Sequence, residues 1–130
     1  MPQRLMQHDV DPAQLIWDKI GDISDIEIFG NNVLLGVYER PEKTKSGIII
    51  TDNTRHEDKH QGKAGLVLKK GPYAFVSDGN YDFRGQDVEV GDWVSIWVSD
   101  GRAINVAGQL CRLVEDQYIR LKIPAPDLVF

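Results

Sequence analysis

The sequence predicts an all-β domain, a small barrel or sandwich that follows one short helix. From residue 65 to residue 123, short apolar runs alternate with turn residues at nearly regular spacing, which is typical of small all-β folds. One segment near the N-terminus, residues 11–21, has the punctuation of a helix. The chain has 130 residues, 42% of them hydrophobic, which is enough for one domain with one core.

The composition excludes several classes of protein. The single cysteine, Cys111, cannot form an internal disulfide, and with three histidines it gives no Cys-rich zinc framework, so we expect a reducing, cytoplasmic setting. The 15 Lys and Arg against 20 Asp and Glu give a net charge of -5 without a basic stripe, so no nucleic-acid partner is expected. No run approaches the roughly 18 apolar residues of a membrane helix, and the first residues do not read as a signal peptide.

The helical segment is defined by its ends. Asp11 stands at the N-cap position, Pro12 at the first helical position and Gly21 just past the end. The apolar residues of the segment share one face: Ala13, Ile16, Trp17 and Ile20. A helix this short is marginal alone in water, so this face must dock on its own domain or on a neighbouring subunit. Residues 26–38 then predict a strand, a bend at 30–32 and a second strand.

Residues 39–64 are polar and charged almost throughout, yet they contain the apolar triplet Ile48-Ile49-Ile50 directly after Gly47. Loops longer than about 12–15 residues without structure of their own are uncommon and tend to be functional or disordered. One interpretation is a short strand buried against the barrel. The other, which the polar flanks favour, is a mobile loop that presents three β-branched side chains to an apolar groove on another protein.

The second interpretation has a consequence for assembly. Burying three isoleucines yields about 5–9 kcal/mol, whereas each loop residue that becomes ordered costs about 1–2 kcal/mol. One loop alone therefore binds weakly. Several identical loops on a symmetric ring bind together through effective concentration, so the hypothesis calls for a homo-oligomer.

The remaining chain predicts a series of strands and turns. Strands are expected at 66–68, 88–90, 93–98, 103–106, 110–114 and 118–123, with one helical turn at 115–117. Asp78-Gly79 and Asp100-Gly101 each indicate a hairpin. Prolines in the tail, residues 124–130, lack the N–H that would extend a ladder.

Aromatic residues concentrate in two of these places. The arms of the first hairpin carry four, which fit a core and a contact with neighbouring copies equally well: Tyr73, Phe75, Tyr81 and Phe83. In the expected strand 93–98, Trp93 and Trp97 are separated by an even number of residues, so both should point to one side, toward a core face or a subunit contact.

Two features could suggest catalysis. His56-Glu57-Asp58-Lys59-His60 matches H-E-x-x-H, the pattern of a zinc hydrolase, but its flanks supply no apolar face to hold such a helix in a cleft. A solvated loop is the simpler interpretation. Cys111 has no obvious base, so we expect a buried structural thiol. No phosphate-binding, dinucleotide-binding or α/β-hydrolase motif is present.

The order of these features resembles that of the GroES small co-chaperonins. Residues 44–51 are similar to the mobile loop of that family, 65–71 to the strand that returns from it, 88–94 (Val-Glu-Val-Gly-Asp-Trp-Val) to a characteristic later strand, and 110–123 to the C-terminal region. The resemblance covers residues 28–123. It implies a partly open β-barrel with a long mobile loop at 39–64 and a roof hairpin at 72–86.

The resemblance also implies a function. Seven subunits would form a ring that caps a GroEL-type chaperonin, with Gly47, Ile48, Ile49 and Ile50 inserted into apolar grooves of that partner. Tyr73, Phe75, Tyr81 and Phe83 would lie on the roof of the enclosed chamber. The large partner alone would bind and hydrolyse ATP, so this chain would be no enzyme and would need no cofactor or metal.

Some features depart from the family pattern. An N-terminal extension, residues 1–27, carries the short helix; Gly30-Asn31-Asn32 replaces a polar-charged start of the first strand; and the tail at 124–130 is extra. These departures suggest a divergent, virus-encoded version, or a GroES-like fold reused as a structural or decoration component of a virus particle. GroES-like domains of medium-chain dehydrogenases share the Val-x-Val-Gly-Asp signature, but no Rossmann half follows here.

Overall fold

The computed structural model describes residues 10–39, 64–79, 81–97 and 99–129. The elements follow in chain order: α1 (Pro12–Ile20), β1 (Asn32–Val37), β2 (Ala64–Lys70), β3 (Trp93–Ser95), β4 (Arg102–Val106), β5 (Gln109–Glu115), the 3-10 turn η1 (Asp116–Tyr118), β6 (Leu121–Ile123) and the 3-10 turn η2 (Pro126–Val129). The residues Gly47 to Ile50 and the His56–His60 motif lie outside the described part of the chain.

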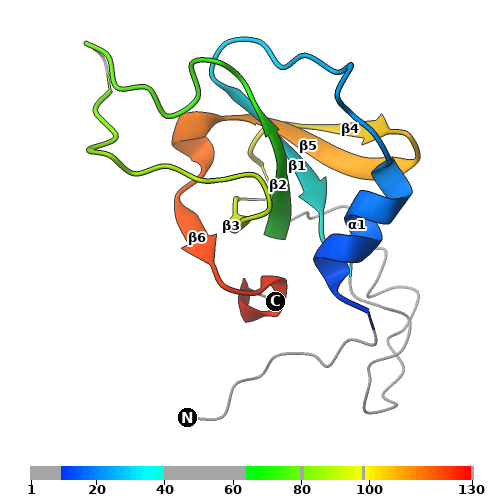
Figure 1. Cartoon of the computed structure of the whole chain (residues 1–130). Helices are drawn as coiled ribbons and strands as arrows, with labels where there is room; N and C mark the ends of the chain where they lie inside the picture. The colour runs from blue at the N-terminus through cyan, green and yellow to red at the C-terminus, as the bar shows by residue number, and fades with distance from the viewer. Residues whose placement is uncertain (1–9, 40–63, 80, 98, 130) are drawn as a thin grey trace.

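The six strands form one antiparallel sheet in the order β4-β5-β1-β2-β3-β6 (Figure 1). The two outer strands, β4 and β6, are not paired with each other, so the sheet curves without closing. The predicted all-β class, a partly open barrel with one short N-terminal helix, is confirmed.

Side chains on alternate positions of the strands build two separate apolar clusters. The helix-side cluster is formed by Ile16, Ile20, Ile23, Ile28, Leu34, Tyr38, Ala64, Leu66, Leu68, Trp93, Cys111 and Ile123. The far-side cluster is formed by Val33, Leu35, Val67, Val88, Val94, Ile96 and Val114. Both faces of the sheet are therefore covered at its centre, where β1 and β2 are buried along most of their length.

The predicted ends of α1 are confirmed. The Asp11 carboxylate accepts a hydrogen bond from the N–H of Ala13 at 3.0 Å, and Gly21 ends the helix at φ +71°. Ile16 and Ile20 are buried in the helix-side cluster, and Ala13 and Trp17 pack against it. The apolar face therefore docks on its own domain, beside β1 and β5 (Figure 1).

Gly36 in β1 allows this docking. A Cβ at this position would lie 2.7 Å from Cγ2 of Ile16 and 3.2 Å from Cδ1 of Leu68. The first distance is shorter than real Cβ atoms show to a neighbouring heavy atom. Helix and strand approach each other this closely only because residue 36 has no side chain.

The strand expected at residues 26–29 is not formed. Two backbone carbonyls in and before this segment are bound by an ammonium group instead of a neighbouring strand. Lys69 Nζ donates to the carbonyl oxygen of Ile23 at 3.0 Å and also to that of Ile26. The lysine thus fastens the segment after α1 to β2.

The prediction that Trp93 and Trp97 share a face is wrong, because β3 ends at Ser95. Trp93 is 8% exposed in the helix-side cluster, whereas Trp97 is 63% exposed. The Arg120 guanidinium lies 4.0 Å from the Trp97 ring centroid, and Asp100 accepts hydrogen bonds from both Arg120 and the Trp97 N–H, each at 3.0 Å. A charged partner, not a core, thus holds Trp97 at the surface.

The structure differs from two further predictions, a hairpin and a strand. The turn at Asp100-Gly101 leads into β4, which pairs with β5 and not with β3. The hairpin is made instead by Ala107-Gly108, where φ values of +50° and +84° give the primed two-residue turn that matches strand twist. Residues 88–90 are not a strand: the Asp92 carboxylate accepts the N–H of Glu89 at 2.9 Å and shapes a turn there.

Candidate functional site

The structure describes the base of the loop that contains the apolar triplet. β1 ends at Val37, which lies opposite Gly65 of β2, and the Tyr38 N–H donates to the Ala64 carbonyl at 3.0 Å. The chain therefore leaves the sheet and returns to it at adjacent points. Gly47 to Ile50 lie outside the described residues, and their role in binding a partner stays a prediction.

Tyr38 anchors this base. Its side chain is 1% exposed and meets the Trp93 ring edge-on, with 5.8 Å between centroids. Its hydroxyl donates a hydrogen bond to the Asp127 carboxylate in η2, which packs on β2 and β3. Because residues from β3 and from the tail hold Tyr38, the loop starts from a fixed point.

The segment 72–86 begins at the other end of β2 (Figure 1). The N–H groups of Gly71 and Tyr73 donate to the carbonyls of Asn32 and Gly30 at 2.8 and 2.9 Å. A Cβ on Gly71 would lie 2.3 Å from the Gly30 oxygen, so only glycine fits this contact.

This segment reverses where the sequence predicts, but its described residues form no strands. The Asp78 N–H donates to the Tyr81 carbonyl and the Tyr81 N–H to the Asp78 carboxylate, each at 2.9 Å. The Ser77 hydroxyl then accepts the Phe83 N–H at 2.9 Å. Side chains, in place of a ladder, satisfy the backbone, so the predicted hairpin is a loop held by its own polar side chains.

The four aromatic residues of this segment divide between core and surface. Phe83 is buried and meets Phe75 edge-on at 5.3 Å and Tyr81 at 4.5 Å between centroids. Phe75 packs against the far-side cluster. Tyr73 is 67% exposed and Tyr81 is 48% exposed. The two tyrosines are therefore the residues of this group that can meet another molecule.

Asp116, at the start of η1, joins three segments although its side chain is only 3% exposed. One carboxylate oxygen accepts the side-chain amide of Asn31 at 3.1 Å, and the other accepts the N–H of Phe75 at 2.9 Å. The Asp116 N–H donates to the Asn31 carbonyl at 3.0 Å. Sequence reasoning missed this residue, because Asn31 lies 85 positions away and no local pattern pairs the two.

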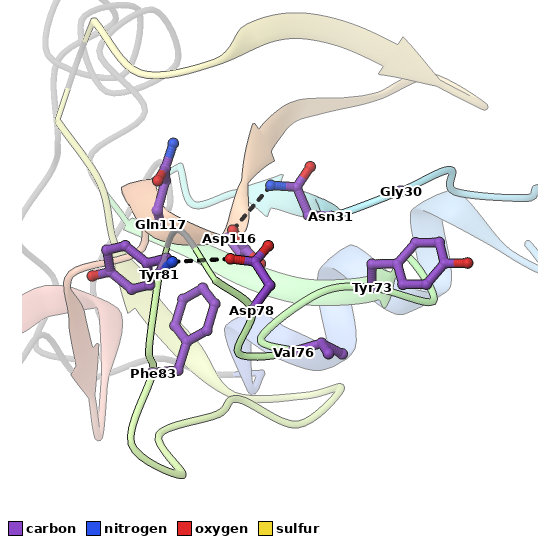
Figure 2. A pocket seen from close by; sticks show the side chains of 9 residues that line it. All are labelled: Gly30, Asn31, Tyr73, Val76, Asp78, Tyr81, Phe83, Asp116 and Gln117. Carbon is purple, nitrogen blue, oxygen red and sulfur yellow. Dashed lines mark hydrogen bonds between the residues drawn. The ribbon is translucent and has the colours of Figure 1, made fainter.

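A pocket of about 510 Å³ opens between these segments (Figure 2). It is lined by Gly30, Asn31, Tyr73, Val76, Asp78, Tyr81, Phe83, Asp116 and Gln117. Figure 2 shows the Asp78 and Asp116 carboxylates at its centre, Tyr81 and Phe83 on one side, and Val76 with Tyr73 on the other. The pocket is therefore acidic at its centre and aromatic or apolar at its walls.

The residues that could suggest catalysis are placed as follows. Cys111 is fully buried, and burial raises the pKa of its thiol to about 11, which disfavours the thiolate that a nucleophile requires. Among the described residues, no group of three His, Cys, Asp or Glu side chains is arranged to hold a metal ion. Within the same part of the chain, no helix is long and apolar enough to span a membrane.

The fold is an open antiparallel sheet, and the chain between its first two strands is polar and contains an aliphatic triplet. The family model described as Cpn10, Chaperonin 10 Kd subunit, matches residues 25–123. The chain belongs to this family, that of the GroES-type co-chaperonins. Membership implies a GroEL-type chaperonin as partner and an oligomeric ring as assembly. The match does not include α1 or η2.

Proposed function

We propose that this protein caps a GroEL-type chaperonin ring and that Gly47, Ile48, Ile49 and Ile50 bind apolar grooves of that ring. The family match carries the proposal: it covers residues 25–123, and the polar segment 39–64 with its aliphatic triplet lies within that range. The anchored base supports it: a loop that starts and ends at fixed, adjacent points loses less freedom on binding than one with a mobile base.

The ring consists of seven subunits in this proposal. Each loop binds weakly alone, and simultaneous binding by several loops gives tight but reversible capture. The large partner binds and hydrolyses ATP, and this chain acts without catalysis or a cofactor in the cytoplasm.

The opposite end of the barrel is assigned to the roof of the chamber. The segment 72–86 carries Tyr73, Phe75, Tyr81 and Phe83, and it begins at the end of β2 away from the loop. Phe75 and Phe83 keep the segment in place through their packing, and the exposed Tyr73 and Tyr81 face the chamber.

Changing Ile48, Ile49 and Ile50 together to serine tests the proposal. We expect this variant to lose ATP-dependent capture by a GroEL-type ring while native mass spectrometry shows an unchanged oligomer. The matched control changes Asp52, Asn53 and Thr54 to serine, three polar residues of the same segment, and keeps capture. Equal capture of both variants contradicts the assignment of the triplet.

The alternative, a structural component of a virus particle, predicts contact with a fixed partner and no response to ATP. One surface that could have made such a contact, the apolar face of α1, is used inside the subunit: Ile16 and Ile20 are buried. This observation favours the co-chaperonin. Stoichiometric presence of the chain in purified virions, together with capture that ignores ATP, would reverse the choice.

A further inference from the structure

We propose that the pocket between Asp116 and the segment 72–86 binds the cationic side chain of an arginine or lysine presented by a polypeptide. This site is separate from the loop at 39–64 and goes beyond the capping function. The argument rests on the charge, the rings and the shape of the pocket.

The charged residues that line the pocket are all acidic. Two of the nine residues that line it, Asp78 and Asp116, are acidic, and none of the nine is Lys, Arg or His. Asp116 is 3% exposed, and its side-chain hydrogen-bond donors among the described residues are neutral, the Asn31 amide and the Phe75 N–H. In the described part of the chain no lysine or arginine forms an ion pair with it. Asp116 therefore acts on the pocket as a buried negative charge, whose field is less screened than in open water, and the exposed Asp78 carboxylate lies beside it.

The rings add a second attraction for the same kind of group. Tyr81 and Phe83 stand together at one wall, with 4.5 Å between ring centroids and an angle of 52° between their planes. Phe83 is buried and Tyr81 is half exposed, so the Tyr81 ring is the one that presents the negative part of its quadrupole to a guanidinium or ammonium group. Phe83 is held from behind by Phe75, so this wall is in place before a ligand arrives.

The shape favours a side chain with an apolar stem over a simple ion. A pocket of about 510 Å³ holds several carbon atoms as well as the charge, and Val76 offers an apolar contact at the opposite wall. The side chains of Asn31 and Gln117 supply amide groups beside it, which suit the peptide groups next to a basic residue. These features together select a basic residue within a polypeptide.

Saturation-transfer difference NMR on the full-length protein tests the proposal, since the method detects weak ligands of large assemblies. The probes are N-acetyl-arginine methylamide, its neutral isostere N-acetyl-citrulline methylamide, and n-butylguanidine, a monocation that keeps the guanidinium and the stem but lacks peptide groups. We expect saturable binding of the arginine probe, and its affinity should fall as the salt concentration rises. The citrulline probe should bind at least about fivefold more weakly. We expect n-butylguanidine to bind more weakly than the arginine probe, because it lacks the peptide groups.

Three variants complete the test. Asp116→Asn and Tyr81→Leu should each weaken binding of the arginine probe about fivefold. Because Asp116 also joins three segments, Tyr81→Leu, which changes a half-exposed ring, keeps the test valid if Asp116→Asn fails to fold. The control Asp25→Asn removes one exposed carboxylate outside the pocket and leaves binding unchanged. Equal binding of the citrulline probe, unchanged affinity in Tyr81→Leu, or equal binding of n-butylguanidine overturns the proposal.

Discussion

The two faces of the sheet are closed in different ways. The far-side cluster is built from the strands and from Val88 and Ile96, all inside the part of the chain that matches the Cpn10 family. The helix-side cluster takes Ile16, Ile20 and Ile23 from α1 and the segment after it, before the match begins. One face is thus covered by the barrel itself and the other by an added layer.

The difference teaches what the N-terminal extension does for the subunit. Strands that carry apolar residues on both faces need a cover on each, because a large exposed apolar patch promotes association. The extension supplies that cover, and Lys69 and Gly36 are the residues of the sheet that receive it. A substitution in the far-side cluster should therefore destabilise the whole sheet, whereas a substitution under α1 should act mainly on the helix.

Leu35→Ala should cause the largest loss. Leu35 is almost fully buried in the far-side cluster, and truncation there should lower the free energy of unfolding by about 2–5 kcal/mol. Urea denaturation measures the loss, and hydrogen exchange should show lower protection in every strand. The control Ile104→Ala, on the exposed edge strand β4, should stay within about 0.5 kcal/mol. A loss of protection confined to β1 would contradict the view of one cooperative barrel.

Gly36→Ala should have a smaller and more local effect. The new methyl group collides with Ile16, which costs about 1–3 kcal/mol, and α1 should lose hydrogen-exchange protection before the sheet does. Ile16→Ala should cost less in the Gly36→Ala background than in the wild type, because the collision is gone. Gly79→Ala serves as control, since nothing lies within 4 Å of its added Cβ. Additive effects of Gly36→Ala and Ile16→Ala would argue against the close approach.

Stability should fall at alkaline pH because of Cys111 in the helix-side cluster. Its pKa is raised from 9.0 to about 11 in the folded protein, so the unfolded chain releases the proton first and stability declines as pH rises between these values. The expected decline is about 1 kcal/mol between about pH 9 and 10. Cys111→Ala should be less stable overall but should lack this part of the slope. An identical slope in both proteins would place its cause elsewhere.

Asp11→Ala should have the smallest effect. Loss of the hydrogen bond to the Ala13 N–H should cost about 0.5–1 kcal/mol, again expressed in α1. Asp11→Asn, which keeps a capping oxygen, should behave almost as the wild type. Equal losses in both variants would indicate that the charge of Asp11 matters and the cap does not.

The sequence predicted those features that local chemistry determines. Asp11, Pro12 and Gly21 define α1 through contacts within a few residues of each other. β2, β4 and β5 follow from runs of apolar and β-branched residues. The ordered set of motifs was sufficient for the family, although no single motif was.

Features that depend on distant partners could not be predicted. Trp97 faces outward because Arg120 and Asp100 bind it, and these residues are far from the alternation pattern that suggested otherwise. Ala107 enters the left-handed region although alanine has no preference for it; the pairing of β4 with β5 imposes this conformation. Asp116 lines the pocket through contacts that only the folded barrel creates.

The bond between Tyr38 and Asp127 joins residues 89 positions apart, and β6 pairs with β3 from the same late part of the chain. A ribosome that has made only the first strands therefore holds a polypeptide whose anchor has not yet been translated. Contacts of such long separation form slowly and expose apolar strands meanwhile. A subunit of this design completes its own architecture only after residue 127 has been made, so until then it exposes the kind of apolar surface that an unfolded client exposes.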